Sequence, residues 1–340
     1  MKKILYGLIL LGLTSSLSAA ETIVGAGATF PYPFYSKIFS DYAKISGVRV
    51  NYQAIGSGGG VRQLQNRTVD FGATDAYVSD KLAKTFPDDI IHIPTCIGAI
   101  TLSYNLPGSP KLRLSGALIA DIYLGKIKRW RDPKILAMNP GVKIPDMMIA
   151  VIYRSDGSGT THVFADFMAK VSPEWKRRVG VGKSLNWPTG LGGKGNPGVA
   201  GLIQQIPGSF GYVELVYTLQ NNMPIVAIQN KSGNFVLPDL GSVTAAIPDT
   251  LPDDLRLVIT DTDSPQGYPI ASFTWIIAYK EQGYRKRTKE QAQALKNLLN
   301  WTITDGQGYA IPLGYAPLSE KTVKQAKKLI SELAYEGTIL

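Results

Sequence analysis

The stretch TIVGAGATFPYPFYSKIFSDYAKISGVRVNYQAIGSGGG, residues 22–60, contains the pattern from which the fold can be predicted. Phe34, Ile38 and Tyr42 recur at helical spacing, whereas Val48 and Val50 alternate with polar neighbours as in a strand. Continued a few residues further, the pattern predicts strands and helices in strict alternation, at 22–25, 31–46, 48–52, 61–65 and 69–74. Such a β-α-β-α-β series predicts an α/β fold with a parallel sheet flanked by helices.

The rest of the chain predicts a second α/β unit and a return to the first. Residues 90–104 form a long β-prone run, broken by Pro94, that could carry the chain from one lobe into another. Residues 183–198 are rich in glycine and are expected to form a loop. We expect further elements as follows: helices at 115–124, 160–168, 199–205, 289–301 and 320–334, and strands at 149–153 and 270–278. If the last segment rejoins the first lobe, two crossings connect the lobes and the cleft between them can close as a hinge.

The first twenty residues predict an export signal. Lys2 and Lys3 precede an apolar run at 4–13, and Ser18 and Ala20 occupy the small-residue positions of a cleavage site. The apolar run is about half as long as a membrane-spanning helix requires. We therefore expect residues 1–20 to be removed. From the two crossings described above, we expect lobe 1 to comprise 21–96 plus 267–340, and lobe 2 to comprise 97–266.

Composition excludes several classes of protein. The chain is 44% apolar and 18% charged, as an ordinary globular protein is. Its only cysteine, Cys96, lies in an apolar run and is expected to be a small buried hydrophobe; with just His92 and His162 beside it, we expect no metal site. The formal net charge of +10 suits attraction of a small anion, and no basic run interleaved with aromatics indicates nucleic acid.

Three turns lie where a strand is expected to end and a helix to begin: residues 25–30, 56–60 and 154–161. A helix N-terminus carries unpaired N–H groups and the positive end of the helix dipole, so it binds anions. Glycine lets the backbone approach a ligand closely, and Ser or Thr adds a hydroxyl donor. Arg154 opens the third turn with a fork of donors suited to a tetrahedral oxyanion, and Asp156 could hold that fork in place or cap the turn.

Asp75 ends a predicted strand at the same edge of the sheet. A carboxylate beside an anion is unfavourable by charge, but it becomes favourable if the anion carries a proton, because a carboxylate only accepts hydrogen bonds. Phosphate carries a P–OH group at neutral pH and sulfate carries no proton. The alternative for Asp75 is a helix N-cap after the strand.

Several blocks of the chain, in the same order, resemble the periplasmic phosphate-binding proteins of Pst-type ABC importers: GAGATFP (25–31), YQAIGSGGG (52–60), VDFGATD (69–75), DIYLGKI (121–127), DGSGT (156–160), GLGGKGN (190–196) and GYVE (211–214). The resemblance thins between about residues 222 and 265. Thr74 and Gly58 depart from it, because relatives often have Ser at the first position and can have it at the second. The resemblance implies a two-lobed type 2 periplasmic-binding-protein fold, in which the two ends of the chain share a lobe.

It also implies how the ligand is held and where it goes. The phosphate-binding residues carried over are Thr29, Phe30, Ser57, Asp75, Arg154, Ser158, Gly159 and Thr160, with no cofactor and no metal. The implied partners are inorganic phosphate and the permease and ATPase of an inner-membrane ABC importer, served by a soluble monomer in the periplasm. Nucleic acid is not an expected partner.

Three alternatives remain from the residues. Ser158 and His162 lie one helical turn apart with Asp156 nearby, as in an enzyme with a nucleophile and a base, but the Gly-x-Ser-x-Gly elbow is absent and we expect no catalysis. A second alternative is a different ligand: sulfate, molybdate or a small phosphorylated metabolite. The third is a structural or adhesion protein of the cell envelope.

Overall fold

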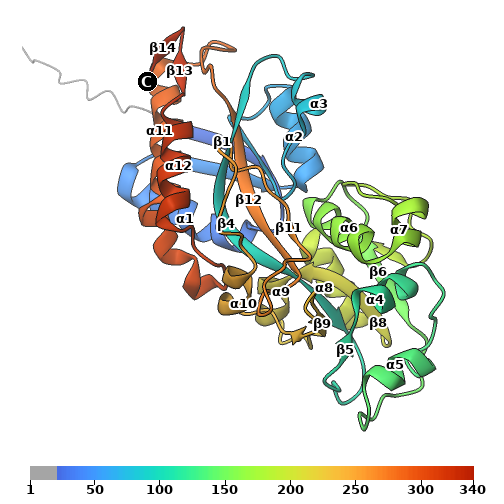
Figure 1. Cartoon of the computed structure of the whole chain (residues 1–340). Coiled ribbons are helices and arrows are strands. Elements are labelled where there is room, and N and C mark those ends of the chain that lie inside the picture. Colours follow the sequence, from blue (N-terminus) through green and yellow to red (C-terminus); the bar gives the residue numbers. More distant parts are fainter. Residues whose placement is uncertain (1–20) are drawn as a thin grey trace, which may run out of the picture.

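The computed structural model describes residues 21–340, so the expected signal segment lies outside the described residues. Figure 1 shows two α/β lobes joined by long strands. The helices are α1 Tyr32–Ser46, α2 Ser57–Gln65, α3 Asp80–Ala83, α4 Gly116–Tyr123, α5 Pro133–Met138, α6 Gly159–Val171, α7 Pro173–Arg178, α8 Gly195–Gln205, α9 Leu215–Gln220, α10 Leu240–Ala245, α11 Lys289–Ile303 and α12 Glu320–Ile330, with 3₁₀ turns at Asp305–Tyr309 and Ile311–Leu313. The strands are β1 Thr22–Gly27, β2 Arg49–Ala54, β3 Phe71–Thr74, β4 Ile90–Tyr104, β5 Arg113–Leu114, β6 Ala150–Arg154, β7 Leu191–Gly193, β8 Ser209–Glu214, β9 Ala227–Gln229, β10 Phe235–Val236, β11 Ile259–Thr260, β12 Ile270–Tyr279, β13 Ala334–Tyr335 and β14 Thr338–Ile339.

The first lobe contains the predicted β-α-β-α-β unit. β1 pairs in parallel with β2 on one side and with β3 on the other. Gly27 closes β1 at φ +147°, and a Cβ there would lie 2.1 Å from the carbonyl oxygen of Ala73. Glycine is therefore required where the first strand turns into the first site loop.

One strand, β4, belongs to both lobes. Its first part, Ile90 to Ala99, pairs antiparallel with β12, and its last part, Ile100 to Tyr104, pairs antiparallel with β8. The strand order of the main sheet is β2-β1-β3-β12-β4-β8-β6-β7, so the sheet is mixed. Pro94 does not break the run as expected, because a bulge against Thr274/Trp275 absorbs the irregularity and the strand continues.

The second lobe departs from the sequence prediction at residues 183–198. This glycine-rich segment was expected to be a loop, but it contains β7, which pairs with β6, and the start of α8 at Gly195. The glycines are needed for close packing: a Cβ on Gly193 would lie 2.7 Å from backbone atoms of Gly198 and Val199. Glycine density here reflects close contact of backbone segments and not the absence of regular structure.

The C-terminal segment packs against the first strands of the chain. β12 inserts between β3 and β4, and α11 and α12 lie beside the strands of that lobe in Figure 1. The last helix ends at Ile330 and not near Ala334, because the chain there forms the hairpin of β13 and β14. Cys96 is fully buried within β4, as the sequence predicted.

The segment 249–256 lies against the first lobe. The side chains of Lys321 and Gln325 donate to the carbonyls of Asp249 and Pro252 at 3.1 and 3.0 Å, and the Trp275 indole donates to the Leu255 carbonyl at 2.9 Å. The chain then contacts lobe 2 again, where Lys170 donates to Thr260. We propose that the lobe boundaries lie at 96/97 and 266/267, with 249–256 as an excursion of lobe 2 onto lobe 1.

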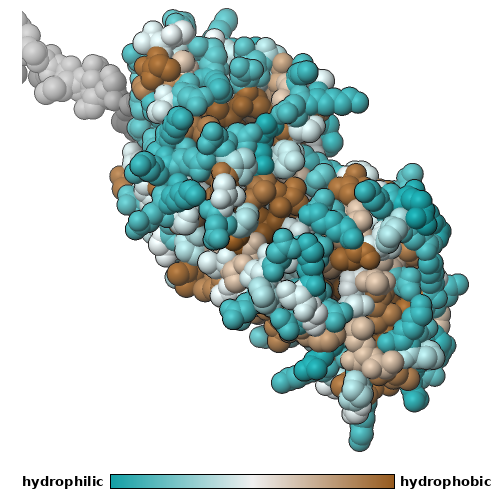
Figure 2. All heavy atoms as spheres, viewed as in Figure 1, coloured by the Kyte–Doolittle hydropathy of each residue, from teal (hydrophilic) through white to brown (hydrophobic). Residues whose placement is uncertain are grey.

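The visible surface is predominantly hydrophilic, with apolar groups in small patches (Figure 2). Within residues 21–340, no helix combines the length and the apolar character needed to cross a membrane. Within the same residues, no group of three or more His, Cys, Asp or Glu side chains is placed to hold a metal ion.

Candidate functional site

The predicted site residues come from both lobes and meet in one place. Thr29 and Phe30 follow β1, Ser57 begins α2, and Asp75 follows β3; Arg154 ends β6, and the remaining three open α6. All of them are almost completely inaccessible, from 0% exposed for Phe30, Ser158 and Thr160 to 4% for Thr29. The site is therefore enclosed between the lobes.

The first loop is held by two tyrosines. The Tyr217 hydroxyl donates to the Thr29 carbonyl at 2.6 Å, and the Tyr315 hydroxyl donates to the Phe30 carbonyl at 2.7 Å. Both phenols are buried, and burial raises their pKa, to well above the usual value for Tyr315, so they remain donors. With its carbonyls fixed in this way, the loop presents its N–H groups and the Thr29 hydroxyl from a rigid backbone.

The second and third loops touch across the cleft. The N–H of Gly58 donates to the carbonyl of Gly157 at 2.8 Å, which joins the start of α2 to the loop before α6. A Cβ on Gly159 would lie 2.5 Å from Ser57 Oγ and 2.7 Å from Asp75 Oδ2. The first amides of α2 and α6 have no acceptor within their own helices. Gly58 N–H is engaged by Gly157 and Thr161 N–H by Ser158 Oγ, and the other first amides remain to offer N–H groups at this junction.

Arg154 is oriented by a buried ion pair. Its Nε and Nη2 donate to the two carboxylate oxygens of Asp156 at 2.8 and 2.6 Å, and its Nη1 lies 3.3 Å from Thr160 Oγ1. The Arg154 side chain is 1% exposed. Burial alone would raise the pKa of Asp156, but the guanidinium lowers it below its usual value. Asp156 therefore holds the fork in place, as one of the two sequence interpretations expected.

Asp75 is surrounded by hydroxyl groups. Thr274 donates to its Oδ1 at 3.1 Å, while Ser57 and Thr160 approach its Oδ2 at 3.4 Å each. Burial raises the pKa of Asp75 to about 6, and the charge of Arg154 is the largest of the effects that oppose the rise. The carboxyl is thus the one acidic group among the predicted contacts. It does not cap a helix, which was the alternative.

Sequence reasoning missed four groups at the site. Thr274, on β12, contacts Asp75 from 199 residues away in the chain, and no local pattern indicated this contact. Asn196 is 0% exposed and contacts both Thr29 and Thr160. The sequence contained a pattern that could have indicated Asn196, because this residue ends the glycine-rich block 190–196, which leads into a helix. Tyr217 follows the GYVE block at 211–214. Lys183 is half-buried near Asp75, and burial lowers its pKa to about 8.

The arrangement around Ser158 is that of a helix cap. Ser158 Oγ accepts a hydrogen bond from the N–H of Thr161 at 3.0 Å, and the Asp156 carboxylate is engaged by Arg154 and by the N–H of Gly195. Burial lowers the pKa of His162. These contacts engage Ser158 Oγ as a helix cap and Asp156 as the partner of Arg154, and they do not form a nucleophile with a base.

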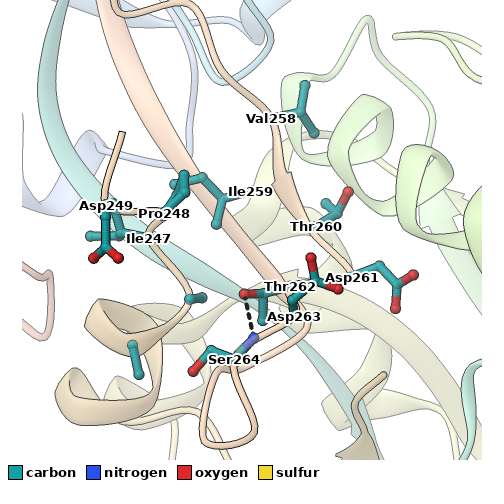
Figure 3. Close-up of a pocket in the computed structure, with 12 residues that line it drawn as sticks. Ile247, Pro248, Asp249, Val258, Ile259, Thr260, Asp261, Thr262, Asp263 and Ser264 are labelled. Carbon is teal, nitrogen blue, oxygen red and sulfur yellow. Dashed lines mark hydrogen bonds between the residues drawn. The ribbon is translucent and has the colours of Figure 1, made fainter. Parts of the chain in front are cut away.

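A separate cavity of about 540 Å³ lies beside α10 and β11 and is shown in Figure 3. Its lining includes Asp249, Asp261 and Asp263, and no Lys or Arg. In the close-up, the N–H of Ser264 donates to Thr262 Oγ1 at 3.2 Å, so two of its polar groups satisfy each other. Lys231 ion-pairs with Asp263, but the lining itself presents three carboxylates and no cationic side chain, so it does not suit an anion.

Two lobes that enclose a ring of hydrogen-bond donors define a solute-binding protein for a small anion. A profile described as a PBP superfamily domain matches residues 14–306. The phosphate-binding protein PstS of Xylella fastidiosa strain 9a5c is 44% identical over 326 residues, covering 92% of this chain and 86% of that protein. PstS of Haemophilus influenzae is 41% identical, covering 96% and 97%. The chain belongs to the PBP superfamily and, within it, to the PstS family of phosphate-binding proteins.

Solved structures of phosphate-binding proteins share this fold. A high-affinity periplasmic phosphate-binding protein, determined with bound phosphate, superimposes with a TM-score of 0.72 at 20% identity, covering 90% of this chain and 93% of that one. The type 2 two-lobed fold expected from the sequence is thereby confirmed.

Proposed function

We propose that this protein binds inorganic phosphate between its lobes, through Thr29, Phe30, Ser57, Asp75, Arg154, Ser158, Gly159 and Thr160. The observation that carries the proposal is the placement of a single acceptor, Asp75, within a ring of N–H, hydroxyl and guanidinium donors. The donors match the oxygens of a tetrahedral oxyanion, and the carboxylate matches a proton on one of them. Membership of the PstS family supports the same ligand.

The protein acts by binding and release. We infer that it is exported to the periplasm as a monomer and delivers phosphate to the permease and ATPase of an ABC importer, the partners of PstS proteins. The enclosure of the site supports this role, because a ligand buried between two lobes is released only when they part. It also disfavours phosphorylated metabolites, since an organic tail would have to leave a site whose contact residues are all buried.

Calorimetry on ligand-stripped protein tests the proposal. We expect one phosphate to bind per chain and about a hundredfold excess of sulfate to leave that binding unchanged, because sulfate offers Asp75 no proton. Arsenate should compete, since it is tetrahedral and protonated. Stoichiometric binding of sulfate, molybdate or a phosphate monoester in preference to phosphate would assign the site to a different ligand.

Gly159→Ala should weaken phosphate binding roughly ten- to a hundredfold. The added Cβ would meet Ser57 and Asp75 at 2.5–2.8 Å, and these side chains belong to the opposite lobe, so the lobes cannot close fully. The matched control is Gly201→Ala, within α8, where a Cβ meets nothing within 4 Å. Titration calorimetry of both variants gives the comparison. Equal affinities for the two would show that the lobes do not need this contact.

A further inference from the structure

Asn196 connects the two lobes within the proposed phosphate site. It stands at the second position of α8 in lobe 2, and its backbone N–H and its Nδ2 both donate to Thr29 Oγ1 in lobe 1, at 3.1 and 3.0 Å. Its Nδ2 also lies 3.3 Å from Thr160 Oγ1. The two hydroxyls that the proposed function uses from opposite lobes therefore share one buried amide.

These contacts determine which way the hydroxyl protons point. A hydroxyl has one proton to donate and two lone pairs to accept with. Both lone pairs of Thr29 are taken by Asn196, so its proton is left to donate. Thr160 Oγ1 likewise accepts from Asn196 and from Arg154 Nη1, and its own proton faces Asp75 Oδ2 at 3.4 Å. Neither hydroxyl can accept a further hydrogen bond.

The orientation of the amide is itself fixed. Asn196 Oδ1 accepts the N–H of Glu214 at 3.1 Å, so a flipped amide would place its NH₂ group against another donor. Every polar group of the Asn196 side chain is thus used, and the side chain is inaccessible to solvent. An amide held this way is a rigid reference for the two threonines.

We propose that Asn196 is a positioning residue that makes Thr29 and Thr160 obligate donors, so that Asp75 is left as the acceptor for a ligand proton. This inference rests on the proposed phosphate site and deepens it. Because Thr29 and Asn196 lie in different lobes, the Thr29 hydroxyl becomes an obligate donor only when the lobes meet. Selectivity for a singly protonated oxyanion is then a property of the closed site.

The test compares Asn196→Leu, nearly the same size but without polar groups, with the wild-type protein. We expect phosphate affinity to fall roughly ten- to a hundredfold, because a freed Thr29 hydroxyl can turn its proton away from the ligand. The loss should be larger near pH 8 than near pH 5, since freed hydroxyl oxygens can accept from the second proton that phosphate carries in acid. A loss that is the same at every pH would overturn the proposal.

A double-mutant cycle with Thr29→Val provides an independent measurement. If Asn196 acts through the Thr29 hydroxyl, Asn196→Leu should cost several-fold less affinity in the Thr29→Val background, and additive effects would contradict the proposal. Asn196→Ala serves if the Leu variant does not fold. The matched control is Asn139→Leu: Asn139 is also buried and fully hydrogen-bonded, but to Arg113 and Ile135 beside α5, so it should change stability and not phosphate affinity.

The same titrations separate this inference from the proposed function. Wild-type protein that fails to bind phosphate would contradict the function itself. Wild-type protein that binds, together with an Asn196→Leu variant of equal affinity and equal pH profile, would contradict only the role of Asn196.

Discussion

Arg154→Ala should lower phosphate affinity by roughly a thousandfold or more. Truncating one partner of a buried, hydrogen-bonded charge pair commonly costs about 2–5 kcal/mol or more. Here the loss has two parts, because the anion loses its guanidinium and the Asp156 carboxylate is left without the cation that both of its oxygens contact. An unpaired carboxylate beside the site adds repulsion to the lost attraction.

The measurement is titration calorimetry, with Arg129→Ala as the matched control. Arg129 also donates through Nε and Nη2 to an aspartate, Asp146, but that pair is about half exposed and lies on the surface of lobe 2. Its removal should leave binding unchanged. Adding Asp156→Asn to Arg154→Ala should restore part of the affinity by removing the stranded charge. An Arg154→Ala variant that binds as wild type does would show that the third loop is only a helix cap.

Asp75→Asn should remove most of the discrimination between phosphate and sulfate. A site that accepts a ligand proton can reject an analogue without it by roughly 10⁴-fold. The amide of Asn can turn its NH₂ group toward a sulfate oxygen, so we expect the preference to fall to about tenfold or less. Asp70→Asn is the control, since Asp70 precedes the same strand but binds Arg287 and the N–H of Val24. Unchanged discrimination in Asp75→Asn would mean that another group selects the ligand.

The pKa of Asp75 adds a pH dependence with a definite sign. Burial raises this pKa to about 6, so the carboxyl becomes a donor as the pH falls through that value. Sulfate binding requires the protonated form. Its affinity for the wild-type protein should therefore be highest below about pH 6 and fall by up to tenfold per unit above it. In Asp75→Asn this dependence should disappear, and a slope that persists would identify a different titrating group.

The three loops of the candidate site could be predicted from the sequence because each of them is local in the chain. A turn between a strand and a helix can be identified from its local sequence alone. This holds for the three turns at 25–30, 56–60 and 154–161. The fold followed from the same alternation. Its parallel first unit was predicted correctly. A strand at 270–278 was also predicted, but not that it inserts antiparallel between β3 and β4.

What could not be predicted depends on contacts between distant segments. Thr274 reaches Asp75 because β12 inserts beside β3, and Asn196 reaches Thr29 because the lobes meet. The errors in the predictions for β4 and β7 also arise from contacts between distant segments. Pro94 is tolerated because β12 accommodates a bulge, and the glycines at 190–195 pack against β6 and α8. In each case tertiary structure decides what the local pattern leaves open.

The shared strand β4 makes the two lobes inseparable as folding units. Its last five residues supply an edge to β8, while its first ten supply the partner of β12. Cutting the chain at either side of this strand would leave one lobe with an open row of unpaired backbone groups. Evolution or engineering can therefore exchange loops at the rim of this molecule far more easily than it can exchange a whole lobe.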